Sequence, residues 1–379
     1  MPDPASRAQR FYHPELDALR FFAFLLVYIS HALPAPGVWV LLPRPLSDIF
    51  IGLSKGGESG VDLFFALSSW LITALLIREH REFGAIDVKA FYIRRILRIW
   101  PLYYTFLLVF RPLVAPLFPS ERMPAIFVAA FALLMGNWAC AVAGFPLSFA
   151  GPLWSVSIEE QFYIVWPMLL RRWLHVLPRI AVGLIAVSFV TRGIMVALHA
   201  KEWTIWSSTL SRLDPIAAGA LVAFLCKGEA LPFTRRVRLA LMLGGVAIFI
   251  AIGRFGSDEG PLALVCYPMA TVASVLIIVG ALTPLGGKHS PLLGKLAYLG
   301  QISYGLYVFH VAMLQLAGIY GLHPLLQALF GLAGTIAVAA LSYHFLESPF
   351  LRLKDRFTRV RSRPVSAVFQ SSRDLAPAR

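Results

Sequence analysis

The stretch LDALRFFAFLLVYISH, residues 16–31, places ionisable side chains in an otherwise apolar segment. On a helix, the eleven residues from Arg20 to His31 make about three whole turns, so both side chains would share one face about 16 Å apart. Asp17 would lie one turn before Arg20 on that face. Polar side chains on a helix in lipid are costly unless they face protein, water or a ligand. This face is therefore the first candidate for a functional site.

Composition indicates the class of protein. Of the 379 residues, 58% are hydrophobic and 14% are charged, which is far from the composition of a soluble globular chain. The net charge of +14 does not indicate a nucleic-acid partner, because the basic residues cluster between apolar runs, as the positive-inside rule predicts for cytoplasmic loops. The three cysteines are scattered in apolar segments, so we expect no disulfide framework and no cysteine metal site. The sequence predicts a polytopic membrane protein.

Eleven apolar segments approach the length of about 20 residues that a bilayer crossing requires. They are 16–31, 61–77, 99–118, 124–143, 153–170, 179–198, 212–227, 237–253, 261–283, 296–316 and 324–346. An odd number of crossings would separate the termini, but the tail after the last segment is as basic as the connectors that we place in the cytoplasm. We therefore expect 124–143 to be re-entrant or interfacial. The predicted fold is all-α, with about ten transmembrane helices and both termini cytoplasmic.

The chain divides into three regions. Residues 1–15 form a polar cytoplasmic tail, 16–350 a membrane domain, and 351–379 a basic cytoplasmic tail that we expect to be disordered towards its end. Within the membrane domain, the proline and glycine content of 35–59 predicts a loop. The first apolar run is expected to stay as a membrane helix, because the prolines after His31 disfavour a signal-peptide cleavage site.

Six motifs follow one another in a specific order. They are LDALRFFAFLLVYISH (16–31), SGVDLFFALSSWLIT (59–73), FYIRRILRIWPLYY (91–104), LWSVSIEEQFYIVWPMLL (153–170), ISYGLYVFH (302–310) and FLESP (345–349). Together they resemble the integral-membrane acyltransferase 3 family, which includes O-antigen acetylases, exopolysaccharide acetyltransferases and macrolide acyltransferases. The most specific pieces are WSVSIEEQFY and the arginine and histidine separated by ten residues.

The resemblance implies a multi-pass enzyme of a bacterial-type cytoplasmic (inner) membrane. Such an enzyme would move an acyl group, commonly acetyl, from acyl-CoA to a hydroxyl of a glycan or small-molecule acceptor. Acyl-CoA would be a donor substrate, with no permanently bound cofactor. The resemblance also implies that Arg20 and His31 are essential.

His31 is the candidate general base, because a neutral imidazole can accept a proton from a hydroxyl near physiological pH. The alternative is a histidine that donates a structural hydrogen bond to a backbone carbonyl. Arg20, Arg94, Arg95 and Arg98 are candidates for binding the coenzyme A phosphates, which guanidinium groups recognise bidentately. The alternative for any one of these arginines is a role in topology and lipid head-group binding.

Glu159 and Glu160 are further catalytic candidates near the start of an apolar helix. Adjacent residues cannot share a helix face, so we expect different roles for them. One could orient a histidine or the acceptor hydroxyl while the other pairs with an arginine; a helix-dipole or capping role is the alternative for both.

Tyr307 and His310 recur with helical spacing after Ser303 and are candidate substrate contacts, as is Asp17 beside Arg20. Hydrogen bonding between helices would explain them equally well. The remaining ionisable residues in apolar runs are expected to pair within the bundle: Asp62, Arg192, Arg212, Asp214 and Glu347. No nucleotide-phosphate loop, nucleophile elbow or metal-ligand motif is present.

Two other classes of function stay open from sequence. A transporter or flippase for a lipid-linked glycan would also carry intramembrane arginine, aspartate and histidine, although the paired interrupted helices of many transporters are missing. A membrane sensor or assembly factor would tolerate the loss of His31.

Overall fold

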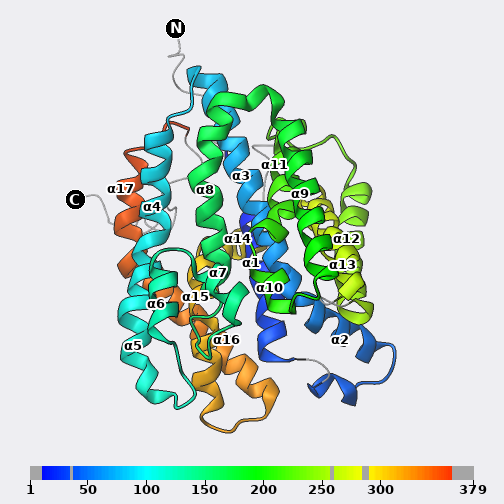
Figure 1. Cartoon of the computed structure of the whole chain (residues 1–379), viewed down its shortest axis with the longest axis vertical. Helices are drawn as coiled ribbons and strands as arrows, with labels where there is room; N and C mark the ends of the chain where they lie inside the picture. The colour runs from blue at the N-terminus through cyan, green and yellow to red at the C-terminus, as the bar shows by residue number, and fades with distance from the viewer. Residues whose placement is uncertain (1–10, 35–36, 257–259, 284–289, 361–379) are drawn as a thin grey trace, which may run out of the picture.

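The computed structural model describes residues 11–34, 37–256, 260–283 and 290–360 (Figure 1). In these ranges the chain is helical, and its sole β feature is an isolated bridge between Arg122 and Leu147. Six helical stretches are long and apolar enough to cross a membrane, so the prediction of an all-helical membrane protein is confirmed. The predictions for the first ten residues and for the disordered end of the C-terminal tail lie outside the described residues.

The helices in chain order are α1 (Pro14–Ala32), α2 (Leu46–Gly56), α3 (Gly60–Phe83), α4 (Val88–Thr105), α5 (Arg111–Val114), α6 (Ala125–Ala132), α7 (Gly136–Ala143), α8 (Leu153–Trp173), α9 (Leu177–Ala197), α10 (Glu202–Ser207), α11 (Leu213–Leu225), α12 (Arg235–Phe255), α13 (Ala263–Ala281), α14 (Pro291–Gln301), α15 (Ser303–Gly318), α16 (Pro324–Ser342) and α17 (Ser348–Asp355). Two π-helical turns, Phe106–Phe110 and Tyr343–Glu347, continue α4 and α16. The 3₁₀ turns are Gly37–Leu41, Gly57–Ser59, Ala115–Leu117, Leu174–Val176, Leu210–Arg212 and Gly260–Leu262.

Helix α1 lies in the interior of the bundle, where Figure 1 shows it beside α14. It packs on α3, α14 and α15. Two of these contacts bring backbones close together, because a Cβ at Gly300 would lie 1.6 Å from the Asp17 carbonyl oxygen and a Cβ at Gly60 would lie 2.5 Å from that of Ala23. Only glycine fits at such positions. The charged segment is therefore enclosed by protein.

Helices α9 and α12 have a different environment. Large apolar side chains such as Val182, Phe189 and Leu243 are exposed on their outer faces. An exposed apolar face of this extent matches contact with lipid. These outer faces of α9 and α12 are therefore the ones that we expect to meet lipid.

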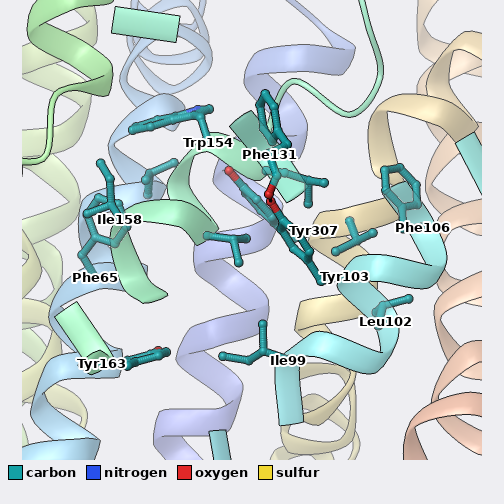
Figure 2. Packing of buried hydrophobic residues seen from close by; sticks show 14 of the residues in the cluster. Phe65, Ile99, Leu102, Tyr103, Phe106, Phe131, Trp154, Ile158, Tyr163 and Tyr307 are labelled. Atoms are coloured by element: carbon teal, nitrogen blue, oxygen red, sulfur yellow. Dashed lines mark hydrogen bonds between the residues drawn. The ribbon is translucent and has the colours of Figure 1, made fainter. Parts of the chain in front are cut away.

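Many of the buried side chains around α4 and α8 are aromatic, as Figure 2 shows. Tyr103 of α4 donates a hydrogen bond to the carbonyl oxygen of Phe131 at 2.8 Å, and Tyr104 donates to that of Ala132 at 3.0 Å. These two bonds reach carbonyl groups in the last turn of α6, where the regular backbone pattern of a helix ends. Helix α4 therefore fixes the position of α6.

The segment 124–143 forms α6 and α7, which have eight residues each. A residue with positive φ, Leu134, separates them. Neither helix reaches the length of about 20 residues that a crossing needs. The expected re-entrant or interfacial position of the segment 124–143 stays a prediction.

The prediction of a loop at 35–59 was wrong, because this range contains α2 and 3₁₀ turns. Its glycines allow close helix packing. A Cβ at Gly56 would lie 2.1 Å from the carbonyl oxygen of Phe249 in α12, and Gly253 of α12 is equally close to Gly56. Small residues at such a crossing let two backbones meet. The glycines of 35–59 therefore indicate close helix packing and not a loop.

Buried ion pairs connect α3 with the 3₁₀ turn Leu210–Arg212, and α9 with α11. Arg212 lies 2.9 Å from Asp62, and Arg192 lies 2.9 Å from Asp214. The expectation of pairing within the bundle is confirmed for these four residues. Glu347 is also buried, in the second π-helical turn.

Candidate active site

A cavity of about 190 Å³ lies among α1, α3, α4, α8 and α15. We call it the arginine cavity, because Arg20, Arg94, Arg95 and Arg98 all line it. Five basic side chains, these four and Lys354, contribute to its walls, against the two carboxylates of Glu79 and Glu159. This excess of positive charge, with guanidinium groups in most of the basic positions, favours an anionic ligand such as a phosphate.

The arginine cavity is elongated along α3. The α3 residues that line it recur every one to four positions from one end of the helix to the other: Val61, Phe64, Phe65, Ser68, Leu71, Leu75 and Glu79. Residues 61 and 79 are eighteen apart, which corresponds to about 27 Å along a helix. The Glu79 end is charged, since Arg94 pairs with Glu79 at 3.2 Å. The Val61 end is apolar.

The four arginines are held in different ways. Arg94 donates to the Phe357 carbonyl oxygen at 2.8 Å, and Arg98 donates to that of Gln301 at 3.2 Å. Arg95 lies over the rings of Phe91 and Tyr163 at 5.4 and 5.5 Å, a favourable cation–π geometry. Each guanidinium is thus positioned on a rigid helix.

Asp17 holds the fourth arginine. It accepts a hydrogen bond from Arg20 at 2.8 Å, one helical turn away. Asp17 is buried and does not line the cavity. It therefore orients Arg20, whereas the sequence suggested a substrate contact.

A second cavity, of about 410 Å³, adjoins the other end of α1. We call it the histidine cavity, because His31 lines it. Three indole rings, of Trp154, Trp203 and Trp206, also form its wall. The acidic side chains are Glu58 and Glu202. Aromatic faces with a few polar groups are typical of sites for small organic ligands.

Sequence reasoning missed most of the histidine cavity. Its residues Glu202, Trp203 and Trp206 come from α10, a six-residue helix between two longer ones. The signal that could have revealed them is the run EWTIW at 202–206, since binding residues are often carried by the segments that connect longer elements.

His31 and His310 lie against each other. The Nδ1 of His31 lies 3.0 Å from the Val27 carbonyl oxygen and 3.3 Å from the Nε2 of His310. The Nδ1 of His310 lies 2.6 Å from the Tyr307 carbonyl oxygen. Since a carbonyl can only accept, both Nδ1 atoms carry the proton, which assigns the tautomers from the hydrogen-bond network.

This tautomer leaves the Nε2 of His31 as the nitrogen that can accept a proton. The side chain of His31 is exposed to the histidine cavity, whereas His310 is completely buried. The Nε2 of His310 therefore positions the ring of His31. The sequence-based expectation that His310 contacts substrate does not match the burial of His310.

The adjacent residues Glu159 and Glu160 have different surroundings. Glu159 lines the arginine cavity and accepts a hydrogen bond from Tyr163 at 3.2 Å. Glu160 is buried and accepts from the indole nitrogen of Trp100 at 2.9 Å. Their side chains point in different directions, as expected for neighbours on a helix. Glu159 is thus the carboxylate that lies beside the arginines.

The two cavities share a wall made by Val61 of α3 and Tyr307 of α15. The Tyr307 hydroxyl lies 2.8 Å from the Ser155 hydroxyl and 3.1 Å from the Pro152 carbonyl oxygen. In the described ranges no group of three His, Cys, Asp or Glu side chains is placed to hold a metal ion. The chemistry open to this arrangement is proton transfer at His31 beside an anion-binding cavity.

Comparison with known proteins agrees with this geometry. Residues 13–344 match the family described as "Acyltransferase domain". The chain is 28% identical over 360 residues to O-acetyltransferase OatA of Staphylococcus aureus strain NCTC 8325, covering 89% of this chain and 57% of the relative. A putative O-acetyltransferase of S. aureus strain MSSA476 is 28% identical over 371 residues, with the same coverage.

The chain thus spans a little over half the length of these relatives. No solved structure matches it. The family match covers most of the chain, including the histidine cavity and the four arginines of the arginine cavity, and it confirms the resemblance carried by the motifs. The chain belongs to the integral-membrane acyltransferase 3 family, whose members are enzymes that transfer acyl groups.

Proposed function

We propose that this protein is a membrane O-acyltransferase. In this proposal acyl-CoA, with acetyl as the acyl group, binds in the arginine cavity, and a hydroxyl of a glycan or small molecule binds in the histidine cavity. One observation carries it: His31, with a free Nε2, lines a cavity that shares a wall with the cavity of the four arginines. The names of the relatives, which are O-acetyltransferases, support acetyl and an oxygen acceptor. The family match gives the transporter alternative no support.

The donor would lie along α3. Its phosphates would meet Arg94 and Lys354 at the charged end, and its pantetheine arm would extend past Arg20 and Glu159 towards Val61. The elongated shape of the cavity, about 27 Å along the helix, suits an extended arm. The thioester would then lie at the wall that both cavities share.

The acceptor would lie against the tryptophans. Indole faces pack well on the apolar face of a sugar or macrocycle, and carboxylates accept hydrogen bonds from its hydroxyls. Glu58 and Glu202 could serve as those acceptors. One hydroxyl of the acceptor would face His31.

The reaction would be direct transfer. The Nε2 of His31 accepts the hydroxyl proton while the acceptor oxygen attacks the thioester carbon. The carbon–sulfur bond then breaks, and the thiolate of coenzyme A takes the proton back from His31. His310 and the Val27 carbonyl hold the imidazole in the tautomer that makes this possible.

About ten crossings and a location in a bacterial-type inner membrane are part of the same proposal. The stretch Leu153–Ala197 contains α8 and α9, each of 21 residues, so the six apolar stretches supply seven crossings. Helices α1, α11 and α15 would add three. The basic α3–α4 and α8–α9 connections lie at one end of the bundle (Figure 1), which supports a cytoplasmic position for that end and for both termini.

The test uses the full chain in lipid nanodiscs with radiolabelled acetyl-CoA. Neutral and acidic oligosaccharides and a macrolide serve as acceptors, and label transfer and thiol release are measured. The variant His31→Gln should lose about 10²–10⁴-fold in rate, as expected for removal of a general base. His175→Gln, at an exposed histidine of the Leu174–Val176 turn, should retain full activity. Absence of His31-dependent transfer to every acceptor would overturn the proposal.

A further inference from the structure

We propose that Val61 and Tyr307 limit the length of the acyl chain that the enzyme accepts. The inference rests on the proposed function, since it concerns the donor in the arginine cavity. It goes further by assigning acyl-chain specificity to two residues that line both cavities.

The first step concerns where the acyl group must lie. His31 lines the histidine cavity and is not part of the arginine cavity. A hydroxyl activated by His31 can reach a thioester in the arginine cavity only at the wall between them. That wall is formed by the side chains of Val61 and Tyr307. The acyl chain of a bound donor therefore ends against these two residues.

The second step is that Tyr307 cannot easily move. Its hydroxyl is hydrogen-bonded to Ser155 and to the Pro152 carbonyl oxygen. Its ring packs on Phe64 with 5.8 Å between centroids and on His310 with 5.5 Å. Swinging the ring aside would break both hydrogen bonds in a buried region, where unpaired polar groups are costly. The tyrosine side of the wall is fixed.

The third step is that the backbone behind Val61 cannot move either. A Cβ at Gly60 would lie 2.5 Å from the Ala23 carbonyl oxygen, and one at Gly57 would lie 2.4 Å from that of Leu26. These contacts press the start of α3 against α1. The clearance at the wall is consequently set by the Val61 side chain, which is itself 4% exposed.

A rigid wall of this kind discriminates by size. In protein pockets one methylene changes selectivity by about 10–200-fold. A butyryl chain has two methylenes more than acetyl, and packed side chains do not make room for them without strain. We expect acetyl to fit against Val61 and butyryl to be rejected.

The test measures binding, so it needs no acceptor. Dethia analogues of acetyl-CoA and butyryl-CoA, in which a methylene replaces the thioester sulfur, are titrated into the full chain in nanodiscs by calorimetry. The wild-type protein should bind the acetyl analogue at least about tenfold more tightly. Val61→Ala should lower this preference about tenfold, and Val61→Ile, which adds a methylene, should raise it.

Two matched valines serve as controls. Val156 lines only the arginine cavity, and Val311 lines only the histidine cavity. Alanine at either position should leave the preference unchanged. Val61 variants that keep the wild-type preference would overturn the inference, and so would a Val156→Ala effect as large as that of Val61→Ala. If the wild-type protein bound neither analogue, the proposed function itself would fail, which is a distinct result.

Discussion

Replacing His310 with leucine should slow the reaction without weakening donor binding. His310 is completely buried and contacts Phe24 and Tyr28 through its ring. Leucine fills this space with an apolar side chain and removes the Nε2 acceptor that lies 3.3 Å from the Nδ1 of His31, together with the Nδ1 donor that lies 2.6 Å from the Tyr307 carbonyl oxygen. The Val27 carbonyl oxygen at 3.0 Å would remain as the sole acceptor for that proton.

The expected magnitude follows from the lost bond to His31, because the other bond that leucine removes, from the Nδ1 of His310 to the Tyr307 carbonyl oxygen, does not involve the proposed base. A neutral hydrogen bond contributes about 0.5–1.5 kcal/mol, which corresponds to about a 2–10-fold change in rate. We therefore expect kcat to fall about 2–10-fold in His310→Leu, far less than in His31→Gln. The KM for acetyl-CoA should stay constant, because neither histidine lines the arginine cavity.

The assay is steady-state thiol release in nanodiscs with the best acceptor found for the wild-type protein. His310→Gln, which keeps an acceptor oxygen, should retain more activity than His310→Leu. In the double variant His31→Gln/His310→Leu the second change should have no further effect, since residues that act as one unit are not additive. The reasoning would be refuted by a further loss in the double variant. A raised KM with unchanged kcat would refute it equally.

Two other predictions concern a cavity arginine and a buried ion pair. Arg95→Gln should raise the KM for acetyl-CoA about tenfold or more, since a charged hydrogen bond contributes about 1.5–3 kcal/mol. Arg172→Gln, at an exposed site on α8, should leave the KM unchanged. Equal KM values in both variants would contradict a role of Arg95 in donor binding. Asp214→Asn should destabilise the fold by about 3–5 kcal/mol because Arg192 is left buried without its counter-charge. Asp48→Asn, at an exposed pair, should cost at most about 1 kcal/mol, and thermal unfolding in one detergent would measure both.

Much of the fold could be predicted because lipid imposes a simple rule. Apolar runs near the length of a crossing mark helices, and helices of the structure lie where those runs were found. A different signal misled at 35–59, where prolines and glycines such as Pro45, Gly52 and Gly56 suggested a loop. Glycine there serves the contact between α2 and α12, and the sequence alone does not show which partner a glycine meets.

The candidate site was predictable in its charged part. The helical spacing of Arg94 or Arg95 with Arg98 allowed at least two of these arginines to point the same way, and the apolar surroundings of Arg20 in its segment marked it as a candidate. The assignment of these residues to two separate cavities was not predictable, because it depends on contacts between distant segments. The pairing of His31 with His310 joins residues 279 apart in sequence, and spacing along one helix contains no information about such a pair.

The stretch 16–31 connects the two cavities. Arg20 lines one cavity and His31 lines the other, so in the proposed mechanism a single buried helix would position both the donor and the acceptor. Positioning of this kind can contribute several kcal/mol to catalysis when the reacting atoms are held in contact. The glycine contacts of α1 with α3 and α14 keep the helix from sliding. The close packing of α1 is therefore part of the proposed mechanism: a shift of this helix would move the base away from the wall at which the thioester must lie.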